Sequence, residues 1–163
     1  MWGIVALKQS SNINSCITKI GFKSTTFFGS SLVDMYSKCE RIDDMWRIFY
    51  KIIVRSVVSW NTMITWYYHY RLGKQAFQLY EQMEIVGMKP THITFIGILS
   101  SCSYVGLVDE GCHYFDSMSQ DYGVTPWVEH YTCVVDLLKQ TSFLNEAKSF
   151  INKIPLDPDI VVW

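Results

Sequence analysis

The chain repeats itself at intervals of 31 to 36 residues, and this feature constrains its fold most. Four anchor residues align the repeats: Ser30, Asn61, Ile96 and Thr132. An apolar pair follows each anchor by two and three residues: Leu32 and Val33, Met63 and Ile64, Ile98 and Leu99, and Val134 and Val135. Fifteen residues after the anchors stand Met45, Ala76, Gly111 and Ala147, of which three are small. Such columns predict an internally repeated fold.

Within each repeat the apolar positions have the spacing of two short helices joined by a turn. Later columns, eighteen, nineteen and twenty-two residues after the anchors, continue the second helix with residues such as Leu79, Tyr80 and Met83. Gly87 with Pro90 predicts the end of one second helix. Because a helical pair cannot bury its own apolar stripe, neighbours must stack against it. The predicted fold is all-α, an α-solenoid of stacked helix-turn-helix repeats.

The composition restricts the function classes. Of 163 residues, 49% are hydrophobic and 18% are charged, which predicts an ordered domain. The net charge of -1 argues against binding duplex nucleic acid mainly by phosphate neutralisation. Five cysteines without a C-x-x-C pair favour a reducing compartment. No apolar stretch is long enough to span a membrane, and the first residues lack the apolar core expected of a secretory signal and the arginine-rich character expected of a transit peptide.

Four stretches carry a recognisable pattern: residues 30–44 (SSLVDMYSKCERIDD), 57–64 (VVSWNTMI), 88–111 (MKPTHITFIGILSSCSYVGLVDEG) and 128–138 (VEHYTCVVDLL). They resemble plant pentatricopeptide repeat (PPR) proteins, and in particular the subclass of organellar RNA-editing factors that alternates standard, long and short repeats. The resemblance implies a right-handed solenoid. It also implies the following order: the second half of a long repeat (1–25), a short repeat (26–56), a standard repeat (57–91), a long repeat (92–127), a final short repeat (128–159) and the start of a C-terminal extension (160–163).

The resemblance also implies which residues read RNA. Such repeats recognise one base each on a single strand, and by the family's pattern the fifth and last residues of a repeat do the reading. Those pairs are Ser30 with Ser56, Asn61 with Thr91, Ile96 with Trp127, and Thr132 with Asp159. The implied 5′ to 3′ preference is purine, pyrimidine, any base, guanine. The third position accepts any base because neither Ile96 nor Trp127 suits a base edge.

The second residue of each repeat is expected, by the same resemblance, to contact the face of the base. These residues are Phe27, Val58, Ile93 and Glu129. Glu129 suits this role poorly, because its carboxylate would repel phosphate. The predicted RNA-binding residues are therefore Ser30, Ser56, Val58, Asn61, Thr91, Ile93, Thr132 and Asp159.

Two alternatives stand beside these assignments. The fifth-place residues have the polar side chains typical of helix N-caps or of exposed surface. His130 and Cys133 share a helix face and suggest a metal site, but a structural zinc site needs four ligands and no partner pair with the right spacing occurs. We predict no metal and no cofactor.

The predicted function is sequence-specific binding of single-stranded RNA, in organellar RNA processing or in choosing sites for cytidine-to-uridine editing. The resemblance implies a mitochondrial or chloroplast location and other editing or processing proteins as partners.

No H-x-E or P-C-x-x-C deaminase motif occurs, so we expect no enzyme activity. We expect the chain to be a piece of a longer protein. Because the apolar faces at both ends of the piece would then be exposed, we expect the piece to self-associate through them. A protein-binding scaffold like a tetratricopeptide array is the alternative, although its W-x₂-L-G-x₂-Y signature is absent. A structural fragment without measurable binding is the third possibility.

Overall fold

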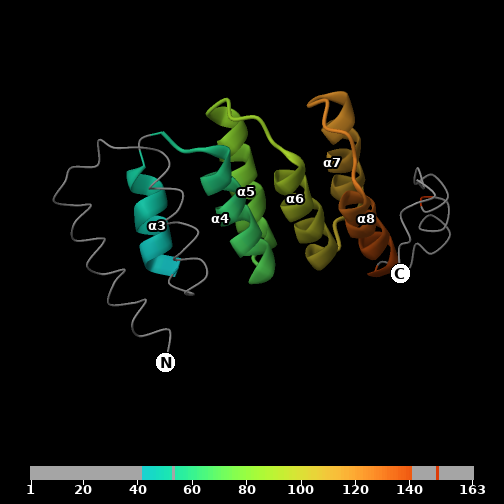
Figure 1. The fold of residues 1–163 in the computed structure, drawn as a ribbon. Coiled ribbons are helices and arrows are strands. Elements are labelled where there is room, and N and C mark those ends of the chain that lie inside the picture. Colours follow the sequence, from blue (N-terminus) through green and yellow to red (C-terminus); the bar gives the residue numbers. More distant parts are fainter. Residues whose placement is uncertain (1–41, 53, 141–149, 151–163) are drawn as a thin grey trace. The chain divides into compact units, whose positions relative to one another are not determined.

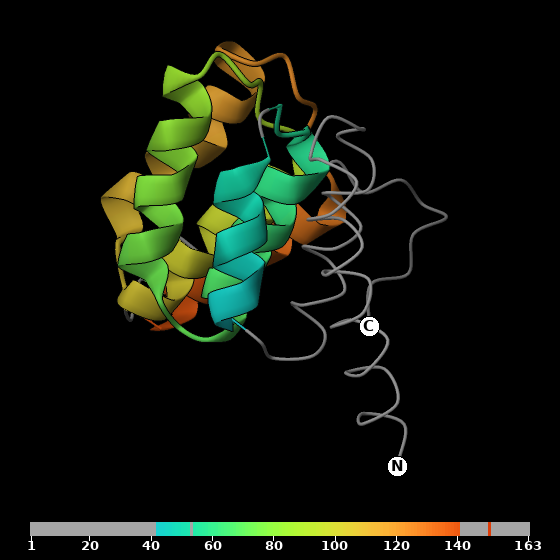
Figure 2. The ribbon, with the colours of Figure 1, turned by 90° about the vertical axis from the view of Figure 1, so that its left-hand side faces the viewer.

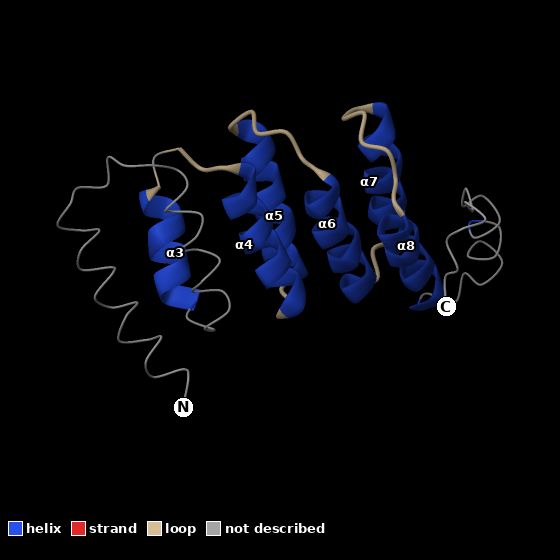
Figure 3. Cartoon of the chain, viewed as in Figure 1, coloured by secondary structure: helices blue, strands red, loops and turns tan. Residues whose placement is uncertain are grey.

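The computed structural model describes residues 42–52, 54–140 and 150, and the regular parts of these residues are helical (Figures 1 and 3). Their helices are α3 (Ile42–Lys51), α4 (Val57–His69), α5 (Gly73–Ile85), α6 (His92–Val105), α7 (Val108–Gln120) and α8 (Val128–Gln140). No strand occurs in these ranges. The all-α prediction is therefore confirmed. Within the same ranges, no helix is long and apolar enough to cross a bilayer.

Successive helices form hairpins, as the apolar spacing predicts. The first helices α4, α6 and α8 start at residues 57, 92 and 128, and each of the first two is followed at once by a second helix, α5 or α7. α3 is the second helix of the preceding repeat. Gly87, which follows α5, and Gly123, which follows α7, both have positive φ angles, of 75° and 66°. These glycines end the second helices because left-handed backbone does not continue a right-handed helix. The repeat boundaries themselves stay a prediction.

The chain divides into two compact units, Met1–Met63 and Ile64–Trp163, and α4 crosses the boundary between them. In the described part of the first unit, the core is built around Phe49 and Trp60. Their rings meet edge to face, with centroids 5.0 Å apart. The side chain of Met45 is fully buried, so the core accommodates the large residue in the small-residue column. Arg55 stacks on the Phe49 ring and donates from Nε to the Phe49 carbonyl oxygen at 2.8 Å.

The second unit arranges its complete helices in two rows, with α6 and α8 in one and α5 and α7 in the other (Figures 1 and 2). α6 packs against α5, α7 and α8. The apolar columns form the core, since these residues are at most 7% exposed: Ile64, Leu79, Tyr80, Met83, Ile98, Leu99, Met118, Val134 and Val135. The repeated burial of the same columns confirms that each helical pair depends on its neighbours.

Gly111 in α7 shows why the small-residue column exists. A Cβ atom at this position would collide with the Leu137 side chain and lie 3.3 Å from the Cys102 Cβ. Ala76, the corresponding residue in α5, is fully buried. Small residues at this register allow the two rows to approach closely, as the sequence predicts.

Candidate functional site

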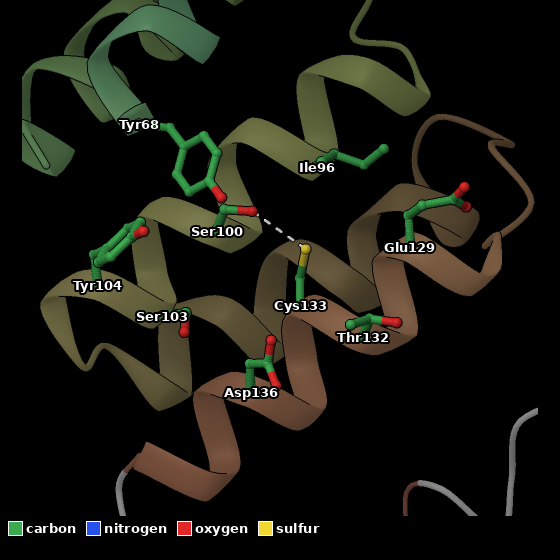
Figure 4. A pocket seen from close by; sticks show the side chains of 9 residues that line it. All are labelled: Tyr68, Ile96, Ser100, Ser103, Tyr104, Glu129, Thr132, Cys133 and Asp136. Atoms are coloured by element: carbon green, nitrogen blue, oxygen red, sulfur yellow. Dashed lines mark hydrogen bonds between the residues drawn. The ribbon is translucent and has the colours of Figure 1, made fainter. Parts of the chain in front are cut away.

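A cavity of about 350 Å³ lies along the first helices of the second unit (Figure 4). We call it the first-helix groove, and its lining residues are Tyr68, Ile96, Ser100, Ser103, Tyr104, Glu129, Thr132, Cys133 and Asp136. The groove brings together the fifth-place residues of two successive repeats, Ile96 and Thr132, with the second-place residue Glu129. The second and fifth places of these repeats therefore lie on one surface between α6 and α8.

Helical periodicity aligns these side chains. On α8, Glu129, Thr132 and Asp136 follow one another at intervals of three and four residues, so they share one face. On α6, Ile96, Ser100 and Ser103 or Tyr104 follow the same rule. The faces of α6 and α8 meet where Ser100 Oγ lies 3.2 Å from Cys133 Sγ (Figure 4).

The groove is rich in hydrogen-bonding groups and contains two acids but no lysine or arginine. Burial raises the pKa of the Cys133 thiol, which therefore stays protonated at neutral pH. Partial burial also raises the pKa of Tyr68, so its phenol remains a neutral donor and acceptor. The Tyr68 and Tyr104 rings lie 5.4 Å apart. This chemistry suits the edges of unpaired bases better than phosphate groups, which the carboxylates of Glu129 and Asp136 would repel.

The structure places the predicted site residues differently from one another. Val58 and Ile93, at the second place, are 55% and 56% exposed. Thr132 is also exposed, and its hydroxyl donates to the Val128 carbonyl oxygen at 2.9 Å. Asn61 is only 6% exposed, so its amide offers little area to a ligand. The predicted residues Ser30 and Asp159, and Phe27 with them, lie outside the described residues.

The last-place residues Ser56 and Thr91 lie at the N-termini of α4 and α6. The Ser59 amide nitrogen donates to Ser56 Oγ at 3.3 Å, and the Thr91 amide nitrogen donates to Thr94 Oγ1 at 2.9 Å. Both last-place residues therefore lie in the hydrogen-bonded ends of these helices. For the fifth place, the helix-cap alternative is wrong for Asn61 and Thr132, because each is the fifth residue of a helix, whereas the surface alternative fits the exposed Thr132.

Trp127, the last residue of its repeat, precedes α8 and is held differently. Its ring stacks on His92, with centroids 3.8 Å apart and planes 16° from parallel. Its amide nitrogen donates to His130 Nδ1 at 2.9 Å, and His130 Nε2 lies 3.0 Å from the His92 carbonyl oxygen. Because Nδ1 accepts, the imidazole is neutral and Nε2 donates to that oxygen.

His130 is fully buried, and this burial lowers its pKa despite the neighbouring Glu129 carboxylate. Both of its ring nitrogens are used inside the protein, which leaves neither for a metal ion. Among the described residues, no group of three or more histidine, cysteine or acidic side chains is placed to hold one. His130 therefore caps α8 and ties it to α6.

Sequence reasoning missed six of the groove residues: Tyr68, Ser100, Ser103, Tyr104, Cys133 and Asp136. A signal was available for most of them. Counting three, four, seven or eight residues onward from the fifth place follows the same helix face, and five of the six residues lie at those distances. Tyr68 lies seven residues after Asn61, whereas Cys133 is four residues after Glu129.

Comparisons with known proteins agree with this architecture. The PPR repeat family matches residues 55–104, and a single PPR repeat matches residues 30–57. A pentatricopeptide repeat-containing protein of Arabidopsis thaliana is 46% identical over 153 residues, which are 90% of this chain and 22% of that protein. Another from the same plant, named mitochondrial, is 41% identical over 160 residues, 98% of this chain and 21% of that protein.

Solved structures show the same fold. Maize PPR10 matches with a TM-score of 0.70 and 24% identity, over 94% of this chain and 23% of that chain. The PPR domain of A. thaliana protein-only RNase P 1 matches with a TM-score of 0.74 and 12% identity, over 95% and 83% of the two chains. The chain spans about a fifth of the length of the curated relatives it matches. Residues 30–104 therefore match models of the PPR repeat, and the chain is similar over most of its length to plant proteins that contain such repeats.

Proposed function

We propose that this chain binds single-stranded RNA along its first helices, with successive repeats contacting successive bases. The observation that carries the proposal is the first-helix groove, in which Ile96 and Thr132 line one cavity with polar side chains from both helices. An unpaired strand has the base edges that such groups can bind. Two solved relatives support it: PPR10 was crystallised with an 18-nucleotide psaJ RNA element, and the RNase P domain with tRNA.

The assignment of bases to residues is part of the proposal. Asn61 with Thr91 would favour a pyrimidine, Ser30 with Ser56 a purine, and Thr132 with Asp159 guanine. Val58 and Ile93 have the exposed apolar side chains that contact with a base face requires. Of the two fifth-place polar residues that the structure describes, Asn61 is buried and Thr132 is exposed. Thr132 is therefore the better position to test.

We further propose that a longer protein containing these repeats acts in organellar RNA processing or chooses sites for cytidine-to-uridine editing. The plant relatives support this role, and one of them is named mitochondrial. The chemistry would then come from partner proteins or other domains, while these repeats position the transcript. Membership of the alternating-repeat subclass rests on the sequence resemblance in residues 30–44, 57–64, 88–111 and 128–138.

The experiment that tests the proposal is selection from a random pool of single-stranded RNA, with DNA and duplex RNA as controls. We expect a short enriched motif on RNA alone. Thr132→Asn should shift the preference at one position of that motif from purine to pyrimidine, because an amide replaces a hydroxyl in the groove. Ser119→Asn makes the same chemical change on the exposed surface of α7 and should leave the motif unchanged. A folded protein that enriches no motif would refute the proposal and favour a protein-binding scaffold.

A further inference from the structure

The standard and short repeats end in hydroxyl residues, Thr91 and Ser56, but the long repeat ends in Trp127. All three occupy the same register, directly before the first residue of a first helix. Trp127 is 52% exposed, which is unusual for so large an apolar side chain. Its exposed position is held by specific contacts, so it calls for an explanation beyond capping.

The contacts of Trp127 define which part of the ring remains accessible. His92 covers one face of the indole in a near-parallel stack, and His130 meets the ring edge-on, at 6.3 Å and 69°. With one face covered and half of the side chain exposed, the opposite face is open to solvent. Ile93, the neighbour of His92, is 56% exposed and adds apolar surface beside the stack.

A single imidazole ties together the two backbone segments that carry the stacked rings. His130 accepts from the Trp127 amide and donates to the His92 carbonyl oxygen, and it is itself fully buried. A surface that is already ordered loses little conformational entropy when a ligand settles on it. Trp127 on His92 is therefore a prepared platform.

We infer that this platform stacks one nucleobase of the bound RNA, so that the long repeat contributes affinity without choosing among bases. The inference rests on the proposed function. An indole face is uncharged, and every base has a π face that it can cover, so aromatic stacking tolerates sequence. The exposed Glu129 carboxylate, two residues away, opposes phosphate at the same place. Ile96, the fifth residue of this repeat, has no hydrogen-bonding group to impose a preference.

The test compares Trp127→Ala, Trp127→Phe and Tyr50→Ala in the full chain, by fluorescence anisotropy with three labelled RNA strands that carry the selected motif and differ only in having A, C or U at its any-base position. Tyr50 is a matched control, since it is 56% exposed and stacks on Trp46 at 5.0 Å, but it lies on the second helix α3. We expect Trp127→Ala to weaken binding roughly 10- to 100-fold and by the same factor for all three strands. Trp127→Phe should keep most of the affinity, and Tyr50→Ala all of it.

Different failures have different meanings. If the unaltered chain binds but Trp127→Ala binds equally well, or loses affinity for one base only, the stacking inference is wrong and the proposed function survives. If the unaltered chain binds none of the strands, the proposed function itself fails and the inference with it. An RNA carrying one abasic position provides a second measurement that does not depend on the variant's stability. Scanned along the motif, it should remove the Trp127→Ala penalty at one position, and a penalty that persists at every position would overturn the inference.

Discussion

The first-helix groove and the Trp127 platform both involve α6 and α8 but differ in chemistry. The groove presents hydroxyls, a thiol and carboxylates, while the platform presents an aromatic face backed by imidazole. Hydrogen-bonding groups distinguish one base from another, whereas an aromatic face accepts any base. On the proposed function, the groove would discriminate between bases and the platform would add affinity for any base.

The largest expected effect comes from removing the imidazole on which the platform depends. His130→Ala leaves a cavity and deprives the Trp127 amide and the His92 carbonyl of their partner, so it should lower the free energy of unfolding by about 2–4 kcal/mol. Urea unfolding followed by circular dichroism measures this change. His113→Ala, on the exposed surface of α7, is the control and should leave stability within about 0.5 kcal/mol. Equal losses for the two variants would contradict the role given to His130.

A smaller loss of stability should follow from acidification, which favours protonation of His130 without a mutation. The folded protein keeps His130 neutral with a lowered pKa, whereas the unfolded chain protonates it near its ordinary value of about 6.5. The unfolded state therefore binds more protons, and stability should fall as the pH drops from 7 towards 5, by at most about 1.4 kcal/mol per pH unit.

The matched measurement repeats the urea titrations on His130→Gln. This variant keeps a polar side chain but cannot titrate, so its stability should depend less on pH than that of the unaltered chain. An identical pH dependence would assign the acid sensitivity to other groups.

The smallest expected effect concerns the charge of the groove. Asp136 lines the groove, and its carboxylate lies 3.8 Å from the Lys139 ammonium, which offsets part of its charge. Asp136→Asn should strengthen RNA binding about twofold at low salt, because one repulsion of phosphate is removed, and the gain should vanish above about 0.5 M salt. Asp116→Asn on α7 is the control for net charge. A gain shared by both variants, or one that persists at high salt, would argue against a strand lying in the groove.

Much of the fold could be predicted because the same sequence positions are buried in successive repeats. Ile98 and Val134 occupy the same column, and each is buried for the same reason, namely that a helical pair must cover its neighbour. The groove could not be predicted so well, because its residues differ between repeats. Ser100 and Cys133 lie on different helices, 33 residues apart in sequence, and no local sequence pattern predicts their contact.

The role of His130 was hidden for a related reason. In sequence it stands near Cys133 and suggests a metal ligand, while its actual partners are a backbone amide three residues before it and a carbonyl 38 residues away. Trp127 was assigned no specificity from its residue type, and the exposed stack that gives it a different use depends on His92 in another helix.

Gly111, the fourth residue of α7, has a consequence for how the helix forms. Glycine disfavours helix by about 1 kcal/mol relative to alanine, and α7 also contains serine, aspartate and histidine, which are weak helix formers. The same missing side chain that lets Leu137 and Cys102 approach therefore leaves α7 with little tendency to form alone. Packing against α6 and α8 stabilises the helical structure of α7, so we expect each helix of this array to become ordered together with its neighbours during folding.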